Sequence, residues 1–265
     1  MVMLHGRGSN GQEFAQEFFS SHLSDNVFLK QKLSGLRWVF PSSQKLWSTA
    51  FQELIPAWFE AHSLTDITAR QDLQIGGIND SVKYLQGLLE NEIARLGGQA
   101  GNLFLGGISQ GGAIGLWTLL CQGPACSIGA FLGASTWLPF ASNLERIISL
   151  RGNMEEERPK ATAEGDGFDA FVSSMMISLQ QEVLPHSLCQ GKPKIFLGHG
   201  VDDAYVDVTL GRQARDALSR AGFVVEWKEY SGAEEEGHWF QVPDEMDDMY
   251  RFIMDIMSQE GNSEG

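Results

Sequence analysis

The chain of 265 residues is poor in cysteine and in basic side chains. Its cysteines, Cys121, Cys126 and Cys189, form an odd number without C-x-x-C spacing, which argues against a disulfide framework and a clustered metal site and favours a reducing compartment. Lysine and arginine number 19 against 34 aspartate and glutamate residues, which gives a net charge of −15. We therefore expect a cytoplasmic protein that binds neither nucleic acid nor an anionic membrane through bulk charge.

The chain also lacks a long uninterrupted apolar stretch. No segment is apolar over the roughly 20 residues that a transmembrane helix needs, and the start at Met1 does not have the pattern of a signal or transit peptide. The C-terminus has no prenylation box and the second residue is valine, so a lipid anchor is not expected. The remaining composition, 43% apolar and 20% charged, predicts one globular domain over 1–258 and a frayed tail at 259–265.

Short apolar runs alternate with stretches of helical period, a pattern typical of an α/β fold with a mostly parallel central sheet and helices on both faces. The runs predict strands at 36–40, 103–107, 128–133, 194–198 and 223–229, with 1–4 as a sixth. Apolar spacing predicts helices over 78–96 and 207–221 and a buried methionine-rich stripe over 246–257. Residues 152–170 are rich in glycine and charge, which predicts a mobile surface loop.

One short motif carries chemistry. The segment Gly107-Ile108-Ser109-Gln110-Gly111 follows a predicted strand and enters an apolar helical stretch, so it is a G-x-S-x-G sequence in strand-turn-helix context. A serine on such a strained turn projects its hydroxyl above the sheet, and the glycines are needed where side chains would collide with the backbone. The first amides of the helix favour negative charge near the serine. An ordinary strand-to-helix turn is the alternative, and the flanking elements favour a nucleophilic Ser109.

A serine hydroxyl is a poor nucleophile at neutral pH and needs a histidine base that an acid orients. The turn resembles that of α/β-hydrolases, in which the order along the chain is serine, acid, histidine. Asp202 and Asp203 directly follow the predicted strand at 194–198, and His238 lies in a loop after the last predicted strand. Spacing alone leaves Asp202 and Asp203 as alternatives for the acid.

Further residues are candidates for the surroundings of Ser109. The glycine-rich segment 4–8 fits a loop that donates a backbone amide to an oxyanion, although alone it would be read as a turn. Several tryptophans in predicted loops are candidates for lining an acyl site, with core packing as an equal alternative; they are Trp47, Trp58, Trp137 and Trp239. We expect no metal, because His199 beside the two aspartates lacks a third ligand at a plausible spacing. No cofactor is expected either, because the glycine-rich stretches lack the residues of a phosphate loop.

Segments spread over most of the chain carry a wider likeness: Leu4-His5-Gly6-Arg7-Gly8, Phe40-Pro41-Ser42, Trp58-Phe59-Glu60, Gly106 to Gly112, Trp137-Leu138-Pro139 and His199 to Val206. Together they resemble the acyl-protein thioesterase family, also called the phospholipase/carboxylesterase family. The resemblance implies an α/β-hydrolase fold with Ser109 as nucleophile, Asp203 as acid and His238 as base. It also implies that the amides of Arg7 and Gln110 form the oxyanion hole. Asp203 is preferred to Asp202 because the family's acid stands three positions before the valine.

The chain departs from the family pattern at several places. Arg7 and Ser9 stand where the family usually has leucine and aspartate, and an arginine at the pocket mouth alters the preference for acyl or head group. Only 1–4 precede the His-Gly loop, so the N-terminal edge strands of the sheet are expected to be missing. Residues 153–190 are longer than the family pattern implies and are predicted to add an insert or lid-like segment.

The resemblance implies a serine hydrolase that cleaves carboxylic esters or thioesters through an acyl-enzyme. Its substrates would be long-chain acyl groups on protein cysteines or on lysophospholipids, and a carboxylesterase of small molecules is the alternative within this class. A catalytically silent binding module is an alternative of a different class. An interaction protein that works through 153–190 is compatible with either.

Overall fold

A computed structural model describes residues 1–63, 65–121, 127–152, 167–177 and 192–261. Its main element is a five-stranded sheet with the order β1-β4-β5-β6-β7, in which every neighbouring pair is parallel. The strands are β1 (Val2–Leu4), β4 (Phe104–Ile108), β5 (Ala130–Ala134), β6 (Lys194–Gly200) and β7 (Val225–Tyr230). The predicted α/β fold with a parallel central sheet is confirmed.

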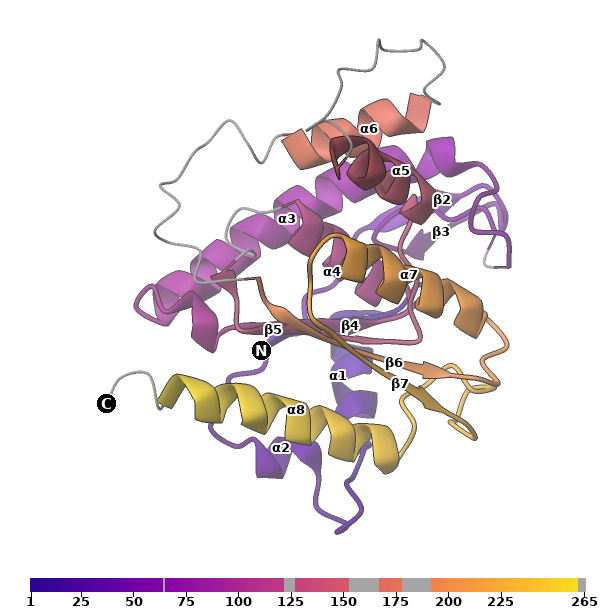
Figure 1. Cartoon of the computed structure of the whole chain (residues 1–265). Helices are drawn as coiled ribbons and strands as arrows, with labels where there is room; N and C mark the ends of the chain where they lie inside the picture. The colour runs from indigo at the N-terminus through magenta and orange to yellow at the C-terminus, as the bar shows by residue number, and fades with distance from the viewer. Residues whose placement is uncertain (64, 122–126, 153–166, 178–191, 262–265) are drawn as a thin grey trace.

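Helices cover both faces of the sheet (Figure 1). One face carries α1 (Gly11–Ser20), α2 (Leu29–Lys32) and α8 (Asp244–Gly261), and the other carries α3 (Gln74–Arg95), α4 (Gln110–Leu120), α5 (Ala141–Gly152), α6 (Gly167–Ile177) and α7 (Val208–Arg220). Successive strand side chains point to opposite faces, so each strand serves two cores. In β6, Phe196 joins the cluster with α1 and α8, whereas Ile195 and Leu197 join the cluster with α3 and α4.

The prediction of a strand at 36–40 is wrong. Only Val39 pairs with the sheet, through a parallel bridge to Val2. The Val39 N–H donates to the Met1 carbonyl and the Val39 carbonyl accepts from the Met3 N–H, both at 2.9 Å. Because β1 is three residues long, and Pro41 has no N–H to continue a ladder, the pairing stops after this bridge.

Other elements were not predicted from the sequence. A two-stranded antiparallel hairpin, β2 (Lys45–Ser48) and β3 (Glu53–Pro56), stands apart from the main sheet. Short 3-10 helices, η1 (Gln71–Leu73) and η2 (Ala100–Asn102), precede α3 and β4. Helix α1 also escaped prediction, although Asn10 caps it by accepting hydrogen bonds from the Gln12 and Glu13 amides.

Three predictions about helices and loops have mixed outcomes. Of the predicted surface loop and lid-like segment, 153–166 and 178–190 lie outside the described residues, whereas 167–177 form α6, which buries Phe171, Val172 and Met175 in the core. Helix α8 continues to Gly261, further than the predicted start of the frayed tail. Its Met246 and Met249 are buried as predicted, but Met257 is 41% exposed because it lies in the last turns of the helix, beyond the packed stripe.

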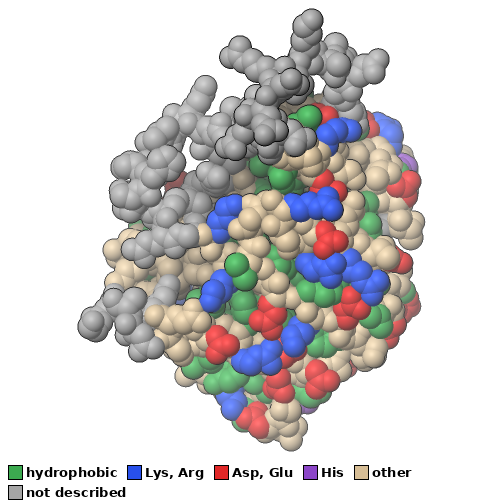
Figure 2. Space-filling model, in the orientation of Figure 1, with side chains coloured by type: hydrophobic (Ala, Val, Ile, Leu, Met, Phe, Trp, Pro, Cys, Tyr) green, Lys and Arg blue, Asp and Glu red, His purple; other side chains and the backbone are tan. Residues whose placement is uncertain are grey.

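The surface carries both signs of charge. On the face shown in Figure 2, lysine and arginine side chains are interspersed with acidic ones, and the basic side chains do not form a separate patch. Among the described residues, no helix is both long enough and apolar enough to cross a bilayer.

Candidate active site

Ser109 lies at the carboxyl end of β4, immediately before α4. Its backbone has φ 54° and ψ −125°, a conformation that a non-glycine residue adopts only when the surrounding structure enforces it. The glycines around it permit the turn: a Cβ at Gly107 would lie 2.6 Å from the Gly111 carbonyl carbon, and a Cβ at Gly111 would collide with the Leu4 and His5 carbonyl oxygens. The strained turn predicted from G-x-S-x-G is therefore present, and Ser109 is 7% exposed at its tip.

Asp203 and His238 are brought together by the loops that follow β6 and β7. The His238 Nδ1 atom lies 2.8 Å from Asp203 Oδ2 and 3.0 Å from Asp203 Oδ1. The Asp203 carboxylate is fully buried, and its Oδ1 also accepts hydrogen bonds from the backbone amides of Tyr205 and Val206, each at 2.9 Å. The carboxylate is thus fixed on one side by the backbone of its own loop and faces the imidazole with the other.

The protonation state of Asp203 follows from these contacts. Burial alone would raise its pKa, but the hydrogen bond and charge of His238, with the amides of Val206 and Tyr205, outweigh burial and hold the pKa below its usual value. An ionised Asp203 keeps the proton of a neutral His238 on Nδ1, which leaves Nε2 with a lone pair able to accept a proton. Asp202, the alternative acid, accepts a hydrogen bond from the Gly232 amide at 2.8 Å instead.

Ser109 and the Asp203–His238 pair occupy the same edge of the sheet, because all three follow the carboxyl ends of parallel strands. No hydrogen bond joins Ser109 Oγ to His238 among the described residues. In ligand-free enzymes this contact is often long and tightens when substrate binds.

The loop containing Arg7 lies against the turn at Ser109. A Cβ added to Gly6 would be 3.4 Å from the Ser109 Cβ. Gln110 is the first residue of α4, so its N–H has no partner within the helix. In the part of the chain that the structure describes, the Arg7 N–H donates no hydrogen bond either. Neither amide therefore has a hydrogen-bond partner among the described residues, and the two come from the segments expected to form an oxyanion hole.

The Arg7 side chain contacts the β2–β3 hairpin. Its guanidinium donates to Ser48 Oγ at 3.0 Å and lies 5.1 Å from the ring centroid of Phe51. Burial lowers the pKa of Arg7, opposed by the charge of Glu60. An arginine at this position ties the loop to the hairpin, which leucine could not do through hydrogen bonds.

Gln110 and Trp58 form buried contacts that the sequence did not reveal. The Gln110 side chain accepts from the Trp58 N–H at 2.9 Å and donates to the Phe59 carbonyl at 2.7 Å. The Trp58 indole N–H in turn donates to the His5 carbonyl at 2.9 Å. These bonds connect the start of α4 to the loop before Arg7. The sequence signals for them were the Trp58-Phe59-Glu60 and Gly106 to Gly112 segments of the family pattern.

The four candidate tryptophans have different environments. Trp47 is 50% exposed on β2, whereas Trp58 and Trp137 are almost fully buried. Trp239, beside His238, makes edge contacts with Phe14 and Phe240.

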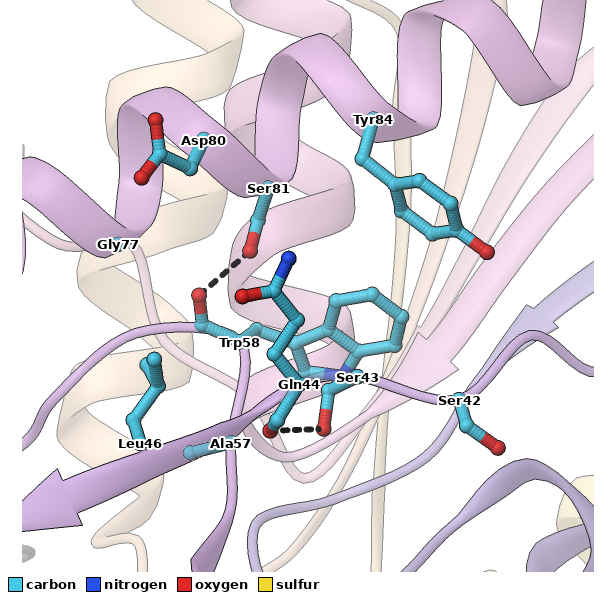
Figure 3. Close-up of a pocket in the computed structure, with 10 residues that line it drawn as sticks. All are labelled: Ser42, Ser43, Gln44, Leu46, Ala57, Trp58, Gly77, Asp80, Ser81 and Tyr84. Carbon is cyan, nitrogen blue, oxygen red and sulfur yellow. Dashed lines mark hydrogen bonds between the residues drawn. The ribbon is translucent and has the colours of Figure 1, made fainter.

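A cavity of about 140 Å³ lies between the 42–46 segment and α3, and Trp58 lines it together with Ala57, Ser81 and Tyr84 (Figure 3). Of the four tryptophans, only Trp58 is among its lining residues. Neither Ser109 nor His238 is among the residues that line it.

His199 is held by the loop that follows β6. Its Nε2 atom lies 2.8 Å from the Val206 carbonyl oxygen, which makes Nε2 the protonated nitrogen, and burial lowers its pKa. No group of three or more histidine, cysteine, aspartate or glutamate residues that could hold a metal ion occurs among the described residues.

The strained serine turn at the carboxyl edge of a parallel sheet, with an aspartate-bound histidine at the same edge, defines the class of α/β-hydrolases. A profile of the phospholipase/carboxylesterase family matches residues 1–155. The chain belongs to this family and is a hydrolase of esters or thioesters.

Three individual relatives share between 22% and 30% of their aligned residues with this chain. Acyl-protein thioesterase 1 of Debaryomyces hansenii is 22% identical over 98% of this chain and 91% of its own length. A rice protein named a probable inactive carboxylesterase is 30% identical over 54% of this chain and 55% of its own length. The crystal structure of Arabidopsis thaliana SOBER1 is similar with a TM-score of 0.65 and 23% identity, and 97% of each chain is covered. This structural likeness shows the shared fold.

Proposed function

We propose that Ser109, Asp203 and His238 form a catalytic triad, and that the chain hydrolyses thioesters of long-chain acyl groups on protein cysteines. The observation that carries the proposal is the hydrogen bond between the buried Asp203 carboxylate and His238, at the same edge of the sheet as the strained Ser109 turn. The name of the Debaryomyces relative supports the thioester. Lysophospholipids, which present the same acyl chain on an oxygen, are the second candidate substrate.

The reaction proceeds in two halves. In the first, Ser109 Oγ attacks the acyl carbonyl carbon while His238 Nε2 takes the hydroxyl proton. The oxyanion that forms accepts hydrogen bonds from the amides of Arg7 and Gln110. The carbon–sulfur bond then breaks, and His238 returns the proton to the leaving thiolate. In the second half His238 Nε2 removes a proton from water while the water oxygen attacks the acyl-serine carbonyl. The bond to Ser109 Oγ then breaks, His238 returns the proton to Oγ, and the carboxylic acid and free Ser109 are released.

The test is hydrolysis of nitrophenyl esters from butyryl to palmitoyl and of a palmitoyl-cysteine peptide, by the wild type and by Ser109→Ala. We expect turnover that increases with chain length and is lost in Ser109→Ala, whose fold is unchanged by circular dichroism. A preference for short chains would establish the small-molecule carboxylesterase instead. Equal rates in wild type and Ser109→Ala would contradict the proposed triad, and a wild type without turnover would favour a silent binding module.

We propose the cytoplasm as the compartment. Cys121 is a buried free thiol, and burial raises its pKa to about 12, so the thiol stays protonated and is unavailable for exchange with disulfides. A free cysteine in the core is compatible with the reducing environment predicted from the cysteine count.

A further inference from the structure

Each amide of the proposed oxyanion hole belongs to a peptide unit with a carbonyl at its other end. A trans peptide is planar, so its C=O and N–H point in opposite directions and the orientation of one fixes the other. The Gln110 N–H is paired in this way with the Ser109 carbonyl, and the Arg7 N–H with the Gly6 carbonyl. Whatever holds these two carbonyls therefore aims the two N–H groups.

A buried hydroxyl holds the first of these carbonyls. Thr136 follows β5, is 2% exposed, and its Oγ1 donates to the Ser109 carbonyl oxygen at 2.8 Å. The same oxygen accepts from the Ala113 N–H at 3.0 Å as the first bond of α4. Gly112 makes the approach possible, because a Cβ at this glycine would lie 2.6 Å from Thr136 Oγ1. Gly112 and Thr136 therefore pack closely against each other.

A buried imidazole holds the second carbonyl. His5 Nε2 accepts from the Ser43 N–H at 2.9 Å, so the proton of the neutral ring is on Nδ1, which donates to the Gly6 carbonyl oxygen at 2.7 Å. The His5 carbonyl is itself held by the Trp58 indole. Both peptide units of the oxyanion hole are therefore fixed by a side chain that lies outside the hole.

We propose that Thr136 is a positioning residue for the oxyanion hole: its hydroxyl holds the Ser109 carbonyl and thereby aims the Gln110 N–H at the developing negative charge. The inference rests on the proposed function of Ser109. In this role Thr136 acts through the Ser109 carbonyl, so its loss should weaken transition-state binding and leave substrate binding almost unchanged.

The experiment compares Thr136→Val with Thr118→Val, a matched control. Thr118 is also fully buried and donates one hydrogen bond to a carbonyl, that of Ile114 at 2.9 Å, but it lies within α4 away from the turn. Deleting an oxyanion donor costs about 100- to 1,000-fold in kcat, so misdirecting one is expected to cost about 10- to 100-fold. Thr136→Val should show this loss in kcat with KM within about twofold, Thr136→Ser should restore most of it, and Thr118→Val should keep the wild-type kcat.

A second readout separates aiming from general loosening. A trifluoromethyl ketone forms an oxyanion adduct with an active serine, so its affinity should fall in Thr136→Val by the same factor as kcat/KM, while both valine variants lose similar thermal stability. Should Thr136→Val fold poorly, Thr136→Ala and Thr118→Ala provide the same comparison. Equal kcat in the two variants of an active wild type would overturn the role of Thr136 alone. An inactive wild type would overturn the proposed function with it.

Discussion

At the scale of single residues, two adjacent carboxylates have different surroundings. The Asp203 side chain is buried and hydrogen-bonded to His238, whereas Asp202 accepts a hydrogen bond from the Gly232 amide. Sequence spacing could not separate them, because the choice depends on the amides of Tyr205 and Val206, which turn the Asp203 carboxylate inward. The family pattern pointed to Asp203 through the position of Val206, the residue whose amide makes one of these bonds.

Asp203→Asn should therefore lower kcat by about 10³- to 10⁴-fold, because an amide facing His238 favours the wrong tautomer of the imidazole. Asp202→Asn is the matched control and should retain most activity, since an asparagine oxygen can still accept from the Gly232 amide. Steady-state kinetics of the two variants with one ester substrate provide the measurement. A larger loss in Asp202→Asn would assign the acid to the other position.

At the scale of elements, long periodic segments and apolar runs were predictable and short exposed ones were not. Helices α3 and α7 bury one clear stripe, β4, β5 and β6 are largely apolar runs, and β7 alternates apolar or aromatic residues with charged ones. The β2–β3 hairpin has no such pattern: its residues are exposed or half-buried except Ser48. Its pairing depends on local cross-strand contacts, and the single bridge at Val39 depends on the length of β1, which apolar character cannot reveal.

Helix α8 contains a buried glutamate whose effect depends on pH. Glu245, in its first turn, is 2% exposed; its Oε2 accepts from the Gln241 amide at 2.9 Å, and its Oε1 has no partner among the described atoms. Burial raises the pKa of Glu245 from 4.5 to about 8, against the opposing Gln241 hydrogen bond. The folded chain then holds a proton that the unfolded chain has released, so stability present below pH 4.5 is lost as the pH rises toward 8.

Glu245→Gln removes this titration while keeping the size of the side chain. Relative to the variant, the free energy of unfolding of the wild type should fall by up to about 1.4 kcal/mol per pH unit within that window. Urea denaturation at several pH values measures the difference, with Glu53→Gln on exposed β3 as control. A difference between wild type and Glu245→Gln that does not change with pH would show that Glu245 is ionised in the folded protein.

At the scale of the whole molecule, the order of the candidate residues along the chain becomes their order across the sheet. Ser109, Asp203 and His238 follow β4, β6 and β7, and parallel strands bring their carboxyl ends to one edge. This is why the sequence could predict the general place of the site. It could not predict the contacts of Thr136, Trp58 and Gln110, because these depend on the paths of loops between elements far apart in the chain.

The central claim, that His238 activates Ser109, is tested most directly by reaction with a fluorophosphonate. The intact mass of the purified chain and peptide mapping would show how many groups are attached and where. We predict a single adduct on Ser109 that does not form in His238→Ala. A folded chain that forms no adduct, or labelling of Ser109 that persists without His238, would contradict it.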